Sequence, residues 1–196
     1  MKAVKGKYYF GGVHPKDGKD LAKSSPLEVM PAPQTVYISV SQSLGKPAVP
    51  CVTAGQAVKE GEIIAKADGA ISSDVFASIA GTVEKIEEIS DGGKTETYIV
   101  IKAAENGGEK FRLPALENPS PEEIKERIRE CGIVGLGGAG FPTAVKVAPR
   151  TPVDTLIVNG AECEPYLTCD HRLMVEKTDE IVRGARLIAK ALGVTQ

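Results

Sequence analysis

Short apolar runs, separated by glycines and polar turn residues, occupy the stretch from Val36 to Lys102. Runs of this length with such punctuation are typical of β-strands joined by tight turns. The pattern therefore predicts a small β-domain, with strands over residues 36–40, 63–65, 81–86 and 97–101.

The next stretch, residues 103–118, is polar and glycine-rich, and prolines interrupt any regular element near its end. A helix start follows at Ser120, with proline at the first helical position and Glu123 where a capping box requires it. This helix is expected to run to about Cys131 and to stop at Gly132. The polar stretch is therefore the expected domain boundary.

The C-terminal part mixes helical and strand patterns. A short helical stretch is expected around Val145, and Thr155–Val158 is a continuous run typical of a strand buried on both faces. A helix over 179–192 gathers its apolar residues on one stripe, made of Ile181, Val182, Ala185, Ile188, Ala189 and Leu192. Helix, loop, strand and helix in this order indicate an α/β layered domain, incomplete because a lone strand has no sheet partners.

Composition narrows the range of functions. The apolar fraction of 42% and charged fraction of 26% are ordinary for a folded globular chain. The net charge of -2, with both signs mixed, provides no basic stripe for nucleic acid. No run of about 18 apolar residues occurs, so the chain is expected neither to span a membrane nor to be exported. No metal site is predicted, because the cysteines are too widely spread, at Cys51, Cys131, Cys163 and Cys169.

The segment from Gly135 to Thr143 contains four glycines within six residues. Glycines let the backbone approach a ligand closely, and successive free N–H groups can cradle a phosphate ahead of a helix. The spacing of Gly135, Gly137 and Gly140 matches the dinucleotide fingerprint G-x-G-x-x-G. That fingerprint should follow a strand, whereas this loop follows a predicted helix, so a plain Rossmann assignment fails.

A second polar segment, Asn159–Pro165, comes directly after the predicted strand. Ligands of α/β sheets usually bind at the carboxyl ends of strands, so one amide and two carboxylates there suit a polar binding cluster. The structural alternative is that these residues close a turn and cap the next helix.

The β-domain itself resembles the barrel-sandwich hybrid fold of biotinyl and lipoyl carrier domains, through residues 55–65 and 77–83. In those carriers a lysine at the tip of the central hairpin takes the cofactor. Here the tip, residues 67–72, contains no lysine, and Lys66 lies where the preceding strand should still run. A structural or docking role is therefore favoured over a swinging arm.

Taken together, Gly135–Thr143 and Asn159–Pro165 resemble the flavin-binding subunit of respiratory complex I, and more closely the C subunit of the Rnf electron-transport complex. The N-terminal motif Phe10–Pro15 also resembles the opening of that subunit, and the carrier-like β-domain occupies its expected place. Ala161 stands where complex I flavin subunits carry Asp, a change that Rnf-type sequences share.

The resemblance implies an α+β chain in which an N-terminal barrel-sandwich hybrid precedes an incomplete, α/β Rossmann-like domain for flavin and NADH. The implied FMN contacts come from Gly135, Gly137, Gly138, Ala139, Gly140, Lys146, Asn159 and Glu162, and the NADH contacts from Phe141 and Glu164. No catalytic residue is expected, since hydride transfer depends on positioning and the cofactor supplies the chemistry. The expected regions are an N-terminal extension (1–34), the hybrid domain (35–103), a linker (104–119) and part of the flavin domain (120–196).

The function implied by the resemblance is oxidation of NADH through FMN, with electrons passing on to two four-iron clusters (4Fe-4S). Such a protein belongs to an ion-translocating Rnf complex, peripheral on the cytoplasmic side of the membrane, with the other subunits and ferredoxin as partners. The cluster ligands and a later pocket segment are not among the 196 residues, so an N-terminal fragment, inactive by itself, is expected. A cobalamin-reductase-like flavoprotein and a non-catalytic docking module are the alternatives.

Overall fold

The structure, a computed structural model, describes residues 15–194 of the chain. The motif predicted at Phe10–Pro15 lies outside these residues except for its last position. The chain folds into two compact units, which we describe separately. One combines the stretch up to Glu28 with Val158–Ile181, and the other combines Val29–Ile157 with the chain from Val182 onward.

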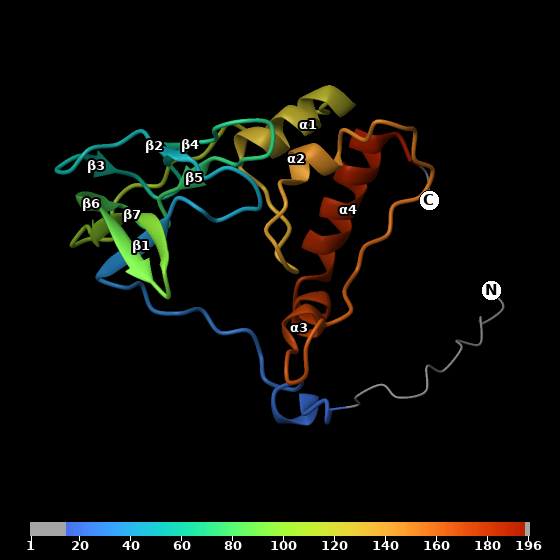
Figure 1. Ribbon diagram of the computed structural model, residues 1–196. Coiled ribbons are helices and arrows are strands. Elements are labelled where there is room, and N and C mark those ends of the chain that lie inside the picture. Colours follow the sequence, from blue (N-terminus) through green and yellow to red (C-terminus); the bar gives the residue numbers. More distant parts are fainter. Residues whose placement is uncertain (1–14, 195–196) are drawn as a thin grey trace. The chain divides into compact units, whose positions relative to one another are not determined.

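The larger unit begins with two antiparallel sheets, one in the order β1-β7-β6-β3 and one in the order β2-β4-β5 (Figure 1). The strands are β1 (Thr35–Ser39), β2 (Val49–Pro50), β3 (Ala57–Val58), β4 (Ile63–Lys66), β5 (Val75–Phe76), β6 (Gly81–Asp91) and β7 (Lys94–Ala103). Each of the four predicted strands is present, as β1, β4, β6 and β7. The two-residue strands β2, β3 and β5 were too short to be seen in the sequence pattern.

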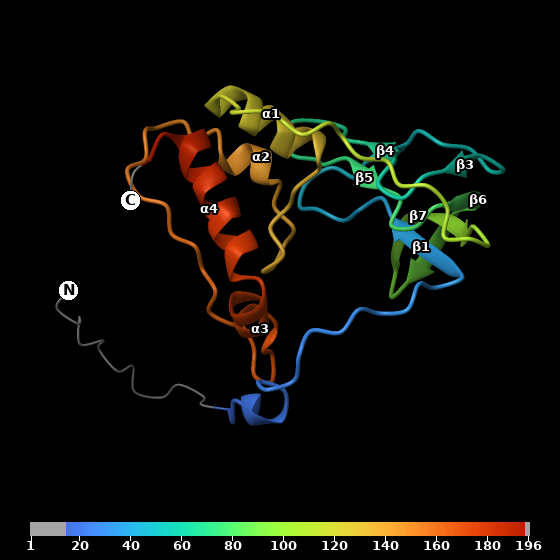
Figure 2. The same cartoon turned by 180° about the vertical axis from the view of Figure 1, so that it is seen from behind.

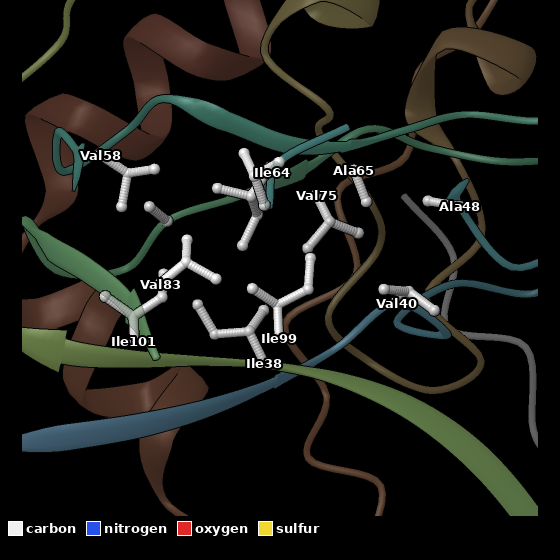
Figure 3. Close-up of a cluster of buried hydrophobic side chains, with 12 residues drawn as sticks. Ile38, Val40, Ala48, Val58, Ile64, Ala65, Val75, Val83, Ile99 and Ile101 are labelled. Atoms are coloured by element: carbon white, nitrogen blue, oxygen red, sulfur yellow. The ribbon is translucent and has the colours of Figure 1, made fainter. Parts of the chain in front are cut away.

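Strand alternation builds the core of the β-domain. Ile38 lies opposite Ile99 in the β1–β7 ladder, and Val83 lies opposite Ile101 in the β6–β7 ladder. These side chains share one face and point toward Ile64 of the other sheet (Figure 3). Because side chains alternate along a strand, one face of each sheet can be apolar while the other stays polar. This packing fixes the register of the sheets.

The hairpin between β4 and β5 has no lysine at its tip, as the sequence predicts. Lys66 is the last residue of β4, and its Nζ forms an ion pair with Oδ2 of Asp74 at 3.1 Å. The other Asp74 oxygen accepts a hydrogen bond from the Ala67 amide at 2.7 Å. Asp74 therefore fixes both the side chain and the backbone at the start of the tip.

The predicted helices are confirmed as α1 (Pro121–Glu130), α2 (Thr143–Lys146) and α4 (Thr178–Leu192). At α1 the Ser120 hydroxyl accepts from the Glu123 amide, and the Glu123 carboxylate accepts from the Ser120 amide, forming the expected capping box. These hydrogen bonds hold the pKa of Glu123 below its ordinary value. In the part of the chain that the structure describes, no helix is both long and apolar enough to cross a bilayer.

A second apolar cluster joins α1, α2 and the second half of α4, which lie together in both views (Figures 1 and 2). Ile124 and Ile128 of α1 meet Val147 after α2, and Ile188 of α4 packs against them. The predicted stripe of α4 is therefore used in part, since Ile188 and Leu192 pack inward while Val182 stays 41% exposed.

The smaller unit is held together by contacts between its two sequence segments. It contains a short 3-10 helix at Lys19–Leu21 and helix α3 (Cys169–Glu176), which no sequence pattern predicted. Lys19 Nζ donates to the Leu167 carbonyl oxygen at 2.7 Å, and the Leu27 amide donates to the Glu176 carboxylate at 3.1 Å.

The predicted buried strand at Thr155–Val158 is wrong. These residues form neither helix nor strand, and the side chains of Ile157 and Val158 are 82% and 60% exposed. A strand needs a neighbour to satisfy its backbone hydrogen bonds. All strands in the described part of the chain belong to the two N-terminal sheets, so this apolar run has no partner strand there.

Candidate functional site

The Gly-rich segment forms a loop with a closed neck. Val134 and Pro142 form an isolated antiparallel bridge, the Gly135 amide donates to the Phe141 carbonyl oxygen at 2.9 Å, and the Thr143 amide donates to the Ile133 carbonyl oxygen at 2.8 Å. Helix α2 begins directly after the neck at Thr143. The loop from Gly135 to Phe141 is thus a defined hairpin, not a loose connection.

The tip of this loop presents unused backbone donors. Within the described residues, the amides from Leu136 to Phe141 donate no hydrogen bond to the protein. A Cβ added at Gly137 or Gly138 would meet no atom within 4 Å, and Leu136 is 94% exposed. Successive free N–H groups without intervening side chains form a concavity suited to an anion or to polar atoms of a cofactor.

A positive charge lies at the base of the same loop. Lys146, the last residue of α2, places its Nζ 5.9 Å from the centroid of the Phe141 ring. The same Nζ would lie 2.6 Å from a Cβ built on Gly135. A glycine at this position therefore leaves room for the ammonium group, which approaches the aromatic face as in a cation–π contact. The structure thus brings Gly135, Phe141 and Lys146 together.

The predicted contacts from Asn159 and Glu162 belong to the smaller unit, and there they perform the structural roles that the sequence left open. The Asn159 side-chain oxygen accepts from the Ala161 amide at 3.0 Å, which closes an Asx turn. The Glu162 carboxylate accepts from the His171 amide at 3.0 Å and from Cys169 Sγ at 3.7 Å, which caps α3. Residue Thr168, at the N-cap position, makes no side-chain cap bond.

Glu164, predicted to face NADH, is exposed and lies on the same segment. Its backbone oxygen accepts a long hydrogen bond from Lys19 Nζ at 3.4 Å. Its carboxylate has no partner among the residues that the structure describes. The ten predicted contact residues are therefore divided between the units: those from Gly135 to Lys146 lie in the larger unit, and Asn159, Glu162 and Glu164 in the smaller one.

One possible ligand set was missed by sequence reasoning. Oxygen atoms of Glu162 and Asp170 and the sulfur of Cys169 lie within 4.8 Å of one another. Only the turn before α3 brings them together, so no sequence spacing signals the group. The Glu162 carboxylate already serves as the cap of α3, and we assign no metal to this group.

The four cysteines, Cys51, Cys131, Cys163 and Cys169, are free and exposed. Partial burial raises the pKa of the Cys51 thiol above its ordinary value. Such a thiol is poorly ionised near neutral pH and is therefore a weak nucleophile.

The fold and the loop together define a chain that joins a barrel-sandwich hybrid to a Gly-rich nucleotide-binding loop. Comparison with protein families agrees. Residues 7–106 match the RnfC barrel sandwich hybrid domain, and residues 128–196 match the Nuo51 FMN-binding domain. The chain therefore belongs to the RnfC family, the C subunits of Rnf complexes. The predicted mixed α+β fold, a barrel-sandwich hybrid followed by the helical part of an FMN-binding domain, is confirmed.

Three relatives, each the C subunit of an oxidoreductase complex, illustrate the similarity. The chain is 41% identical over 194 residues to that of the proton-translocating ferredoxin:NAD(+) oxidoreductase complex of Clostridium ljungdahlii, covering 96% of this chain and 42% of that protein. It is 42% identical to that of the ion-translocating oxidoreductase complex of Rhodobacter capsulatus, covering 95% and 37%. It is 37% identical to that of the Na(+)-translocating ferredoxin:NAD(+) oxidoreductase complex of Acetobacterium woodii, covering 97% and 44%. The chain thus spans less than half the length of each relative.

Proposed function

We propose that this chain forms the flavin-binding part of the C subunit of an ion-translocating ferredoxin:NAD(+) oxidoreductase complex, where it takes part in electron transfer between NADH and ferredoxin. The observation that carries the proposal is the Gly-rich loop, with free amides at its tip and Lys146 at its base. We use residues 35–103 as the hybrid domain and 120–196 as the flavin-binding part.

The loop suits FMN because that cofactor offers a phosphate and polar ring atoms. Amides around Gly137 and Gly138 are free to donate to such acceptors, and the ammonium group of Lys146 supplies a compensating charge. When bound, FMN supplies the hydride-accepting chemistry. The contribution of this chain is to bind and orient it, which agrees with the absence of an expected catalytic side chain.

The roles of Asn159, Glu162 and Glu164 in this proposal are narrower than the resemblance implies. Asn159 uses its side-chain oxygen within the Asx turn, which leaves its NH₂ group to donate to a ligand. Glu162 acts first as the cap of α3 and so shapes the segment that carries the exposed Glu164 carboxylate. Glu164 and the Phe141 ring are our candidates for NADH contacts, through ribose hydroxyls and ring stacking.

The assembly belongs to the proposal as well. Its relatives are subunits of ion-translocating complexes, so we place this chain as a peripheral component on the cytoplasmic side of a membrane, beside other Rnf subunits. The two four-iron clusters implied by the resemblance stay a prediction for longer members of the family.

The test is a titration of the purified chain with FMN, followed by flavin fluorescence and thermal shift. A carboxylate at Gly138 would place negative charge where the phosphate is expected, whereas Asn has nearly the same size without the charge. We therefore expect saturable binding by the wild type, no measurable binding by Gly138→Asp, and retained, weaker binding by Gly138→Asn. Equal affinity of the two variants would contradict a phosphate at the loop.

A non-catalytic docking module is the second candidate, because Asn159 and Glu162 already serve the local fold. It predicts that neither FMN nor NADH shifts the melting temperature of the wild-type chain. The same titration therefore decides between the two functions.

A further inference from the structure

The Gly-rich loop rests on a loop of the β-domain, residues 41–46, which we call the bracing loop. The Leu44 amide donates to the Ala139 carbonyl oxygen at 2.9 Å. Gly140 is buried and has a φ of 64°, and a Cβ there would lie 2.7 Å from the Gln42 carbonyl oxygen and 3.2 Å from Ser43 Cα. Only glycine allows this backbone approach, so the seating of the Gly-rich loop is built into both segments.

The bracing loop is in turn held by the tip of the β4–β5 hairpin, residues 67–72. The Lys46 amide donates to the Ile71 carbonyl oxygen at 3.0 Å, and the Lys46 ammonium pairs with the Asp68 carboxylate. The Ser72 hydroxyl links the two sides, since it accepts from the Asp68 amide at 3.1 Å and donates to the Lys46 carbonyl oxygen at 2.8 Å.

Close backbone packing strengthens this contact. Gly45 has a φ of 115°, and a Cβ built there would clash with the carbonyl oxygen of Ile71. The hairpin tip, the bracing loop and the Gly-rich loop therefore form three layers in direct backbone contact. They all lie within one compact unit of the chain.

We propose that the hairpin tip and the bracing loop hold the Gly-rich loop in its ligand-binding shape, with Ser72 as the positioning residue that joins them. Free amides bind well only when their directions are fixed in advance, because a mobile loop loses conformational entropy on binding. The hairpin tip, where carrier domains hold a cofactor lysine, here supports a separate binding loop. The inference rests on the proposed function for the identity of the ligand, FMN.

The test compares Ser72→Ala with Ser72→Thr, which restores the hydroxyl. Ser90→Ala is the matched control, since the Ser90 hydroxyl bonds to Thr95 at 2.8 Å in the β6–β7 hairpin, away from the bracing loop. Two readouts are followed: hydrogen exchange of the Leu44 amide by NMR, and FMN affinity. Because Ser72→Ala loses a hydrogen bond of ordinary strength, we expect it to speed Leu44 exchange and weaken FMN binding roughly fivefold each. The other two variants should match the wild type.

Unchanged Leu44 exchange in Ser72→Ala would overturn the brace. Faster exchange with unchanged FMN affinity would also overturn the inference, because the brace would then have no effect on the site. A wild-type chain that binds no FMN defeats the proposed function instead, and Leu44 exchange alone then decides whether the tip supports the loop.

Discussion

Gly140 offers the sharpest test of how the Gly-rich loop is held. Replacing it with Ala adds a Cβ at a φ of 64°, 2.7 Å from the Gln42 carbonyl oxygen. The left-handed conformation costs a non-glycine residue about 1 to 2 kcal/mol. The contact with backbone adds a cost of similar size, because neither Gln42 nor Ser43 can move without disturbing the bracing loop. We therefore expect the free energy of unfolding to fall by about 3 kcal/mol, or roughly 6 to 12 °C in melting temperature.

Gly137→Ala is the matched control, since a Cβ there meets no atom within 4 Å and its φ is not in the left-handed region. Its stability should equal that of the wild type or exceed it slightly, because Ala restricts the unfolded chain. Thermal and urea unfolding followed by far-UV circular dichroism measures both variants. If Gly140→Ala proved as stable as Gly137→Ala, the close seating of the Gly-rich loop on Gln42 would be refuted.

Two further outcomes are expected. Lys146→Gln should weaken FMN binding about five- to thirtyfold, as the loss of one partly screened charge contact predicts, whereas Lys146→Arg retains most of the affinity; isothermal titration at two salt concentrations checks this, and equal affinities of all three forms would remove Lys146 from the site. The pKa of Glu176 is held below 4.5, chiefly by its hydrogen bond from Arg172. Its stabilising contribution is therefore present above the ordinary carboxyl pKa and is lost as the pH falls through the lowered folded value. Urea unfolding at pH 7 and pH 3 should show a smaller acid loss in Glu176→Gln than in the wild type, and identical pH profiles would contradict the pairing.

Several elements could be predicted because their causes are local. The Ser120 capping box needs only the residues of the first helical turn, and it forms as expected with Glu123. The long strands β6 and β7 follow from short apolar runs with a tight turn between them. The Gly-rich loop was also visible, since its glycines are adjacent in sequence.

Other features could not be read from the sequence. The run Thr155–Val158 has the composition of a buried strand, yet it stays exposed because no strand of the described chain pairs with it. Asn159 and Glu162 have the chemistry of ligand contacts, but the backbone of the following segment uses them for a turn and a helix cap. In both cases a distant or subsequent partner decides the outcome, and residue type alone does not contain that information.

The sequence by itself determined the order of strands and helices, the helix caps and the positions where glycine was needed, because these depend on neighbouring residues and their backbone preferences. Only the tertiary structure decided what lies behind the Gly-rich loop. The Leu44–Ala139 hydrogen bond and the Ser72 link join segments that are far apart in the sequence and have no shared pattern. Such contacts depend on the packing of two sheets against each other, which sets the distance between the bracing loop and the hairpin tip.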